Sequence, residues 1–446
     1  MNSHVVNQDY ITSTLGLLEF IRKSPTSYQA VECMRQQFDT AGFIFLPEQE
    51  PWRMQRGGCY YTIRNGSSIM AFRVGAELEY PAFRIAASHA DSPSFKVKAI
   101  PDLEGPAGYL RVNTEVYGGA IDRTWLDRPL SVAGRVMVRD DSGVRSQLVS
   151  VDKDLLLIPS VAIHMNRSVN ESGAIDRHID LYPILSAGTE GKGALKRVVA
   201  NELGVTPNQI CAWDLYVVNR QPGVIWGAQR EFVSSARLDD LQCAYASCTA
   251  LLGPCDPHAI CVHACFDNEE VGSGTMQGAL STFLPDVLTR VCDALGMDAE
   301  TRRSAVARSF MVSCDNAHAV HPNHPELCDP TNQVRLNGGV VIKEAASQRY
   351  ATDAMSRSLF QELCMRADVP TQAYANRSDM PGGSTLGNLA MRQASMHTVD
   401  VGLPQLAMHS AYETAGTRDT AHMVSALSAF FGERFDIAPN DEIRFF

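Results

Sequence analysis

An apolar run that ends in two adjacent glutamates restricts the possible folds of this chain more than any other feature. Residues 259–266 are almost entirely apolar, and the polar stretch 267–273 follows them with Glu269 and Glu270 side by side. A bounded run of this kind predicts a buried strand. Because adjacent side chains at a strand end point in different directions, one carboxylate can hold a metal ion while the other transfers a proton. An isolated pair of glutamates is more often simply solvated, so the prediction depends on the rest of the chain.

Four other strand-like runs also lead into potential metal ligands. They are 83–88 before His89 and Asp91, 310–314 before Asp315, 234–238 before Asp239 and Asp240, and 406–408 before His409. In open α/β sheets, sites form beyond the carboxyl ends of strands, so we expect these side chains to gather there. Imidazoles and carboxylates together suit zinc, and manganese or cobalt could also occupy such a site. A single buried histidine is more often structural, and it is the repeated pattern that favours a metal site.

Long strings around these residues resemble a known family. The stretches 88–93 (SHADSP), 236–241 (ARLDDL) and 267–273 (DNEEVGS) are similar to those of the aspartyl aminopeptidases, which form the M18 family of di-zinc peptidases. The resemblance continues through 315–323 and 405–410 and covers nearly the whole chain from about Tyr60. It implies an α/β fold with a mixed-sheet, zinc-aminopeptidase-like catalytic domain and an inserted β-rich dimerisation domain.

The resemblance also implies a metal site, residue by residue. One zinc ion would be held by His89 and Asp315, the other by Glu270 and His409, and Asp239 would bridge them. A carboxylate bridge keeps two cations close enough to act on one water molecule and one carbonyl group.

Three further acids receive roles from the same resemblance. Glu269 would be the general base that takes a proton from the attacking water. Asp91 would orient His89 through its imidazole N–H. Asp240 is expected to act outside the set of metal ligands, because relatives carry asparagine at that position.

Substrate recognition is implied at five residues. Lys343 matches the lysine that the family uses for an acidic substrate side chain, whereas its position alone would suggest a solvated residue at a strand end. Gly383 and Ser384 lie in a glycine-rich string, 380–387, whose backbone N–H groups can approach an anion; by itself it would be an ordinary turn. His318 flanks Asp315, as does His321, and could contact substrate. His164 matches a histidine that reaches the active site of a neighbouring subunit.

Patterning divides the chain into three segments. Residues 1–93 and 237–446 are expected to form the two parts of the catalytic domain, and 94–236 the inserted domain. Helical spacing covers about 10–40, 242–252, 285–295, 356–367 and 418–431, and strands are expected across 60–90. Within the insertion, 132–138 and 147–149 flank a turn at 140–143 and predict a hairpin, and 215–218 predict another strand.

Composition limits the alternatives. The net charge of −11 argues against nonspecific binding to nucleic acid, and no apolar stretch approaches the length of a membrane span. The twelve cysteines are scattered and the first eight residues lack an apolar signal core, so we expect a reducing cytoplasm and no disulfide framework.

The sequence therefore predicts a metalloaminopeptidase that removes Asp or Glu from peptide amino termini with two zinc ions per subunit. Relatives imply a homo-oligomer, a dodecamer built from dimers. Two alternatives remain, namely a di-metal aminopeptidase of broader specificity and a catalytically silent assembly or cargo protein that retains the fold.

Overall fold

The computed structural model describes residues 8–380, 382–440 and 442–446. Two parts of the sequence analysis lie outside this description. They are the first seven residues, which carry most of the argument about a signal core, and Pro381 of the glycine-rich string. No helix within the described ranges is long and apolar enough to cross a membrane. The twelve cysteines all fall inside these ranges and are free thiols, as the sequence predicts.

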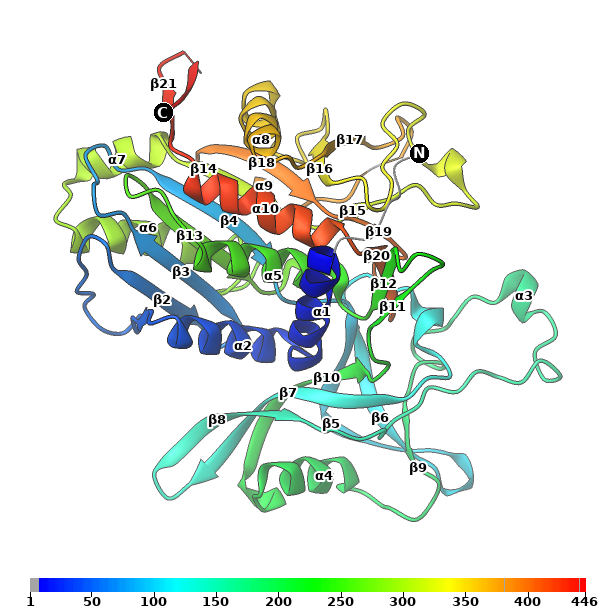
Figure 1. Cartoon of the computed structure of the whole chain (residues 1–446). Coiled ribbons are helices and arrows are strands. Elements are labelled where there is room, and N and C mark those ends of the chain that lie inside the picture. The colour runs from blue at the N-terminus through cyan, green and yellow to red at the C-terminus, as the bar shows by residue number, and fades with distance from the viewer. Residues whose placement is uncertain (1–7, 381, 441) are drawn as a thin grey trace.

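A nine-stranded mixed sheet forms the centre of the larger part of the molecule (Figure 1). In spatial order its strands are β1 (Ile44–Phe45), β2 (Cys59–Arg64), β3 (Ser68–Val74), β13 (Ile260–Phe266), β4 (Phe83–His89), β14 (Phe310–Cys314), β18 (His397–Gly402), β16 (Val340–Glu344) and β17 (Thr371–Ala375). The four central strands, β13, β4, β14 and β18, are parallel to one another. Both faces of these strands are buried, which explains why they appear in the sequence as continuous apolar runs.

Helices cover both faces of this sheet. One face carries α1 (Gln8–Lys23), α2 (Ser27–Thr40), α5 (Leu238–Leu252), α8 (Ala354–Arg366) and α10 (Asp419–Gly432), and the other carries α6 (Phe283–Ala294), α7 (Ala299–Ala307) and the short α9 (Leu386–Ala390). Each set of helices closes a separate apolar core against the sheet. The architecture is therefore the mixed α/β arrangement that the sequence predicts.

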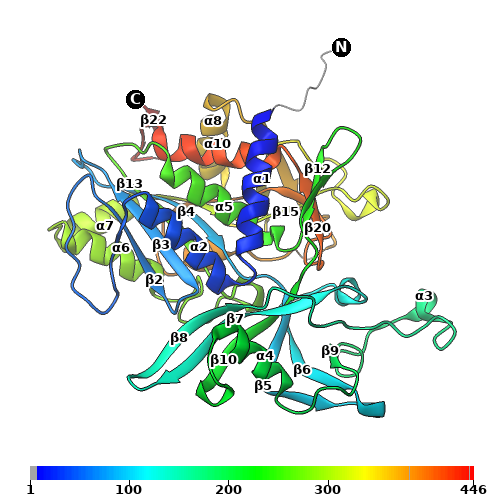
Figure 2. The ribbon, with the colours of Figure 1, turned by 60° about the horizontal axis from the view of Figure 1, so that its bottom comes forward.

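A second sheet, of six strands, forms a distinct body on one side of the catalytic part (Figure 2). Its strands, in spatial order, are β8 (Gly143–Ser150), β7 (Leu130–Asp140), β10 (Ile210–Asn219), β5 (Ser94–Glu104), β6 (Leu110–Tyr117) and β9 (Ile184–Ser186). Helix α4 (Ala194–Leu203) packs on it and completes a third apolar core. A long connection that carries α3 (Val169–Ser172) extends away from this body in both views (Figures 1 and 2).

Two smaller sheets complete the fold. The strands of the five-stranded sheet are β11 (Val224–Trp226), β12 (Phe232–Ser235), β20 (Glu413–Gly416), β19 (Pro404–Leu406) and β15 (Ala317–His318), and the last two strands, β21 (Phe435–Ala438) and β22 (Glu442–Phe445), form a hairpin. Strands β11 and β12 lie within the range 94–236 that we expect for the insertion, yet they pair with β20 rather than with the six-stranded sheet. The domain boundaries themselves stay a prediction.

Most expected elements are present, with local differences. The run 10–40 forms two helices instead of one, because Pro25 interrupts the helical pattern. The expected hairpin is β7 and β8. Strands β12 and β19 end earlier than the runs 234–238 and 406–408 suggest, since Arg237 (φ 58°) and Ala407 (φ 56°) adopt left-handed backbone conformations that leave the strand. Helices α4 and α7 were not expected from the sequence.

Candidate active site and metal centre

Three parallel strands deliver part of the candidate site to one edge of the large sheet. His89 is the last residue of β4, Glu269 and Glu270 lie in the turn directly after β13, and Asp315 follows β14. Since β13, β4 and β14 run in the same direction, their carboxyl ends meet at this edge. This is the arrangement that the repeated pattern of strand and polar residue predicts.

The five-stranded sheet delivers the other two residues. Asp239 follows β12 at the start of α5, and His409 follows β19. Strand β20 lies between β12 and β19, so the loops that leave these two strands are neighbours. The candidate site therefore lies where loops from two different sheets meet.

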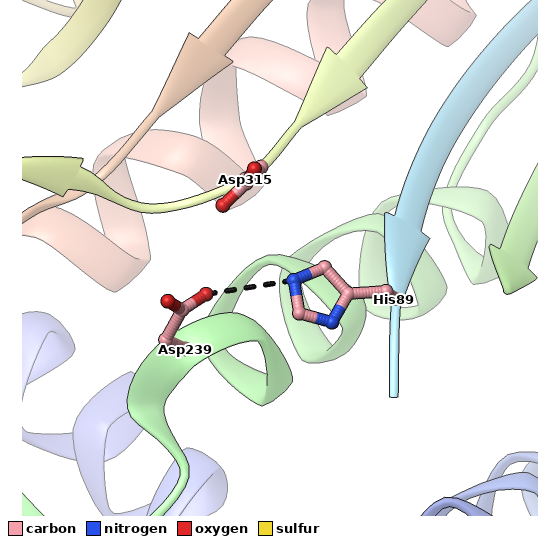
Figure 3. A group of neighbouring side chains, drawn as sticks. All are labelled: His89, Asp239 and Asp315. Atoms are coloured by element: carbon pink, nitrogen blue, oxygen red, sulfur yellow. Dashed lines mark ion pairs between the residues drawn. The ribbon is translucent and has the colours of Figure 1, made fainter. Parts of the chain in front are cut away.

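The five expected ligands form two groups that share one carboxylate. His89, Asp239 and Asp315 make up the first group, drawn in Figure 3, and Asp239, Glu270 and His409 make up the second; in each, the ligand atoms lie within 4.8 Å of one another. The Nε2 atom of His89 is 3.5 Å from Asp239 Oδ1, and the Nε2 atom of His409 is 3.4 Å from Asp239 Oδ2. Asp239 thus presents one oxygen to each imidazole.

Both imidazoles are held at the nitrogen that faces away from Asp239. The Nδ1 atom of His89 lies 3.1 Å from the carbonyl oxygen of Asp91, and that of His409 lies 3.1 Å from the carbonyl oxygen of Gly119. A carbonyl oxygen can only accept, so Nδ1 carries the proton in each contact and Nε2 offers its lone pair to a metal ion. Gly119 belongs to the loop after β6, and nothing in the sequence marked it as part of the site.

Burial and neighbouring charges shift the pKa values of the acids and of His409 in this site. Burial and the neighbouring charge of Asp239 raise the pKa of Glu270 well above its usual value, and burial also raises the pKa of Asp315. Burial opposes ionisation of Asp239 as well, but contacts with His409 and His89 hold its pKa below the usual range. Although burial opposes protonation of His409, its acidic neighbours raise its pKa to about 10.

These observations fit a pair of metal ions. Asp239 Oδ1 and Glu270 Oε1 are buried and have no hydrogen-bond partner among the described residues. A buried carboxylate oxygen without a partner is costly, and cations that bind it remove the cost and relieve the repulsion between the acids. The donor set of imidazole nitrogens and carboxylate oxygens is one that zinc accepts.

The two adjacent glutamates occupy different positions, as the opening argument requires. Glu270 belongs to the second group of ligands, whereas Glu269 lines the neighbouring cavity. Asp91 accepts hydrogen bonds from both backbone N–H groups, of Glu269 and Glu270, at 3.1 Å each, and from the hydroxyl of Tyr117 at 2.7 Å. Asp91 thus fixes the turn that separates the two side chains, in addition to its contact with His89. The roles assigned to these residues stay predictions.

A cavity of about 170 Å³ opens beside the two groups. Four of its lining residues were expected from the sequence to bind substrate, namely Lys343, His318, Gly383 and Ser384. Tyr350 and Tyr374 also line it and were missed, because an aromatic residue without a charged neighbour in sequence gives no signal of a site. A Cβ atom on Gly383 would meet nothing within 4 Å, so this glycine is not required by steric crowding.

Lys343 is the cation of this cavity. It is only 2% exposed, and its Nζ atom donates to the carbonyl oxygen of Asp315 at 2.7 Å and lies 5.3 Å from the centre of the Tyr350 ring. Burial opposes the charge, but the nearby Asp315 carboxylate raises the pKa of Lys343, so the side chain stays protonated. The alternative suggested by its position alone, a solvated lysine at a strand end, is therefore wrong.

His164 lies elsewhere. It is exposed in a turn between β8 and α3 and is not among the described residues that line the cavity. The expected role of His164 at the active site of a neighbouring subunit stays a prediction.

Comparison with known proteins decides the family. The family described as aminopeptidase I zinc metalloprotease (M18) matches residues 20–431. The chain belongs to the M18 family of metalloaminopeptidases.

Individual M18 relatives agree over nearly the full length. A probable M18 family aminopeptidase 2 from Clostridium novyi is 43% identical over 421 residues, which cover 93% of this chain and 97% of the relative. A relative of the same description from Stutzerimonas stutzeri is 39% identical over 422 residues, with the same coverage. The family membership that the sequence suggests is thus confirmed.

Solved M18 structures share the fold. The cryo-EM structure of an Ape4 and Nbr1 complex contains a chain that is 35% identical, with a TM-score of 0.92, over 96% of this chain and 87% of that one. The Saccharomyces cerevisiae mApe1 dodecamer is 28% identical, with a TM-score of 0.83, over 95% and 97% of the two chains. The expected α/β fold of a zinc aminopeptidase is therefore confirmed.

Proposed function

We propose that this M18 aminopeptidase releases aspartate and glutamate from peptide amino termini and uses two zinc ions per subunit. The observation that carries the proposal is the buried, protonated Lys343 in the cavity beside the two groups of ligands. A cation inside a small cavity stabilises a carboxylate that enters it and gives little to a neutral side chain. Manganese or cobalt in place of zinc would suit the same donors.

Each of the two groups of residues would hold one zinc ion. His89 and Asp315 would hold one zinc ion, Glu270 and His409 the other, with Asp239 between them. Bound zinc polarises a carbonyl group and lowers the pKa of water.

Glu269 supplies proton transfer. It faces the cavity and is kept out of both groups of ligands by the turn that Asp91 fixes. In the metal-free chain, burial and the nearby acids raise the pKa of Glu269 to about 8, despite the opposing effect of His89. Cations nearby would lower this pKa again, so that the carboxylate takes a proton from water and passes it to the leaving amine.

The side-chain pocket is formed by Lys343 and the residues around it. Tyr350 and Tyr374 are both largely buried and pack with their rings 6.3 Å apart, and the His318 ring contacts Tyr374 edge-on. These residues help to line a cavity of only about 170 Å³, which favours short acidic side chains over long ones. Gly383 and Ser384 also line it, and backbone N–H groups there can meet an anion.

Assembly into a homo-oligomer forms part of the same proposal. Three apolar residues next to His164 in the sequence are strongly exposed: Val161 (53%), Ile163 (49%) and Met165 (82%). An exposed apolar patch on a projecting connection marks an interaction site, and a second copy would cover it and receive His164. A solved relative is a dodecamer, which supports assembly of this chain into a homo-oligomer.

One paired experiment tests this function against its alternatives. Metal analysis of the purified protein should find two zinc ions per subunit, and hydrolysis of Asp- and Glu-amide substrates should exceed that of Leu- and Lys-amides by at least tenfold. Similar rates on all four substrates would favour an aminopeptidase of broader specificity. Absence of chelator-sensitive hydrolysis of any of them would favour the silent assembly or cargo protein.

A further inference from the structure

Glu413 makes two hydrogen bonds to the backbone of the candidate metal site. It is the first residue of β20, and its side chain is 2% exposed. One carboxylate oxygen, Oε2, accepts from the backbone N–H of Asp239 at 3.1 Å, and the other, Oε1, accepts from the backbone N–H of His409 at 2.7 Å. A single buried carboxylate thus joins the residue shared by both groups of ligands to a histidine of the second group.

The position of β20 explains why one side chain can reach both loops. Strand β20 pairs with β12 on one side, where Glu413 is opposite Ser235, and with β19 on the other. Both neighbouring strands have already turned away where the expected ligands occur, through the left-handed residues Arg237 (φ 58°) and Ala407 (φ 56°), and His409 itself is left-handed (φ 68°). Left-handed conformations are unfavourable for such residues and persist only when the surroundings hold them.

The contact repeats a pattern seen on the other side of the site. Asp91 accepts two backbone N–H groups, from Glu269 and Glu270, and so holds the turn after β13. Glu413 holds the loops after β12 and β19 in the same manner. Asp91 can be recognised from the sequence as a residue of the site because it lies two positions from His89. Nothing in the sequence around Glu413 indicated such a role.

We propose that Glu413 is a positioning residue that sets the separation of Asp239 and His409 and thereby the affinity for the metal ion of the second group. This inference rests on the proposed di-metal function. With cations bound nearby, the carboxylate of Glu413 is ionised and can accept at both oxygens, whereas the amide of glutamine has one acceptor and one donor. In Glu413→Gln, one of the two backbone N–H groups would therefore face an NH₂ group and lose its partner.

The expected effect is selective. Loss of a residue that orients metal ligands weakens metal affinity by about 10- to 100-fold. In Glu413→Gln, the zinc ion of the second group should dissociate at a correspondingly lower concentration of chelator. Since Asp239 also belongs to the first group, the other ion should lose affinity by a smaller factor.

The matched control is Asp419→Asn. Asp419 lies in α10, is fully buried, and accepts the backbone N–H groups of Asn337 at 2.8 Å and Gly339 at 3.3 Å. Asp419→Asn also removes a buried carboxylate that accepts two backbone N–H groups, but neither Asn337 nor Gly339 is an expected metal ligand. A general loss of stability would therefore affect both variants alike.

The test is zinc binding to full-length wild type and both variants, measured by competition with a chromophoric chelator. The proposal holds if Glu413→Gln loses affinity for one ion about 10-fold or more and Asp419→Asn keeps both wild-type affinities. It fails if Glu413→Gln binds both ions like wild type, or if the control loses as much. If Glu413→Gln does not fold, Glu413→Asp, which is too short to reach both N–H groups, is judged by the same two results. A wild-type protein that binds fewer than two ions would instead overturn the di-metal function.

Discussion

The Lys343→Met variant tests the basis of acidic specificity. The substitution keeps a long apolar side chain in the buried position and removes the charge that faces the cavity. A hydrogen bond to a charged group contributes about 1.5–3 kcal/mol, so kcat/KM for an Asp-amide substrate should fall by about 10- to 150-fold. A neutral Leu-amide substrate makes no such bond and should lose far less.

A smaller loss is expected on every substrate. The Nζ atom of Lys343 also donates to the carbonyl oxygen of Asp315, one of the expected metal ligands. Removal of this donor leaves a buried acceptor unpaired and disturbs the ligand. The measured quantity is therefore the ratio of kcat/KM between Asp- and Leu-amides, in which the shared loss cancels.

The control is Lys96→Met. Lys96 is a half-buried lysine of β5 that pairs with Asp214 at 3.0 Å, outside the set of residues that line the cavity. This variant should leave the ratio unchanged, although it alters the net charge by the same amount. An unchanged ratio in Lys343→Met would refute the reasoning and remove Lys343 from substrate recognition.

Three further predictions concern catalysis, pH and assembly. Glu269→Gln should keep two zinc ions and lose roughly 10²- to 10⁴-fold in kcat, while Glu270→Gln should lose one ion in metal analysis; the opposite result would exchange their roles. In the metal-free protein, burial raises the pKa of Glu269 and of Glu413 to about 8, so the native state holds protons that the unfolded chain releases above pH 5. As the pH rises from about 5 to 8, the free energy of unfolding should therefore fall by about 1.4 kcal/mol per pH unit for each proton held, and a rise measured in denaturant melts would contradict this assignment. Finally, inactive His164→Phe and Glu269→Gln subunits should regain part of their activity when mixed, and no recovery despite exchange shown by a tagged pull-down would place His164 outside the neighbour's site.

The five residues of the two groups could be singled out from the sequence because each one comes at or after the end of a strand. Runs such as 260–266 are apolar since both faces of a central strand are covered, and the next polar residue then marks the edge of the sheet. His89 and Asp315 obey this rule directly. Asp239 obeys it less closely, because β12 ends four residues before it.

The remainder of the site depends on contacts between distant segments, which leave no local pattern. The Gly119 contact with His409 uses a backbone oxygen and gives no information about residue type. Tyr350 and Tyr374 reach the cavity from different elements, and Glu413 acts through two hydrogen bonds that span different sequence distances. The break between α1 and α2 was missed for a simpler reason, since the helical spacing is similar on both sides of Pro25.

The wide distribution of the ligands has a consequence for biosynthesis. The first expected ligand along the chain is His89 and the last is His409. Strand β19, which precedes His409, pairs with β20, at residues 413–416. A ribosome must therefore release the chain beyond β20 before the second group of expected ligands is complete, whereas the last member of the first group is Asp315. Occupation of the second group by a cation would then be a late step, and a nascent chain interrupted before His409 would lack that part of the expected metal site.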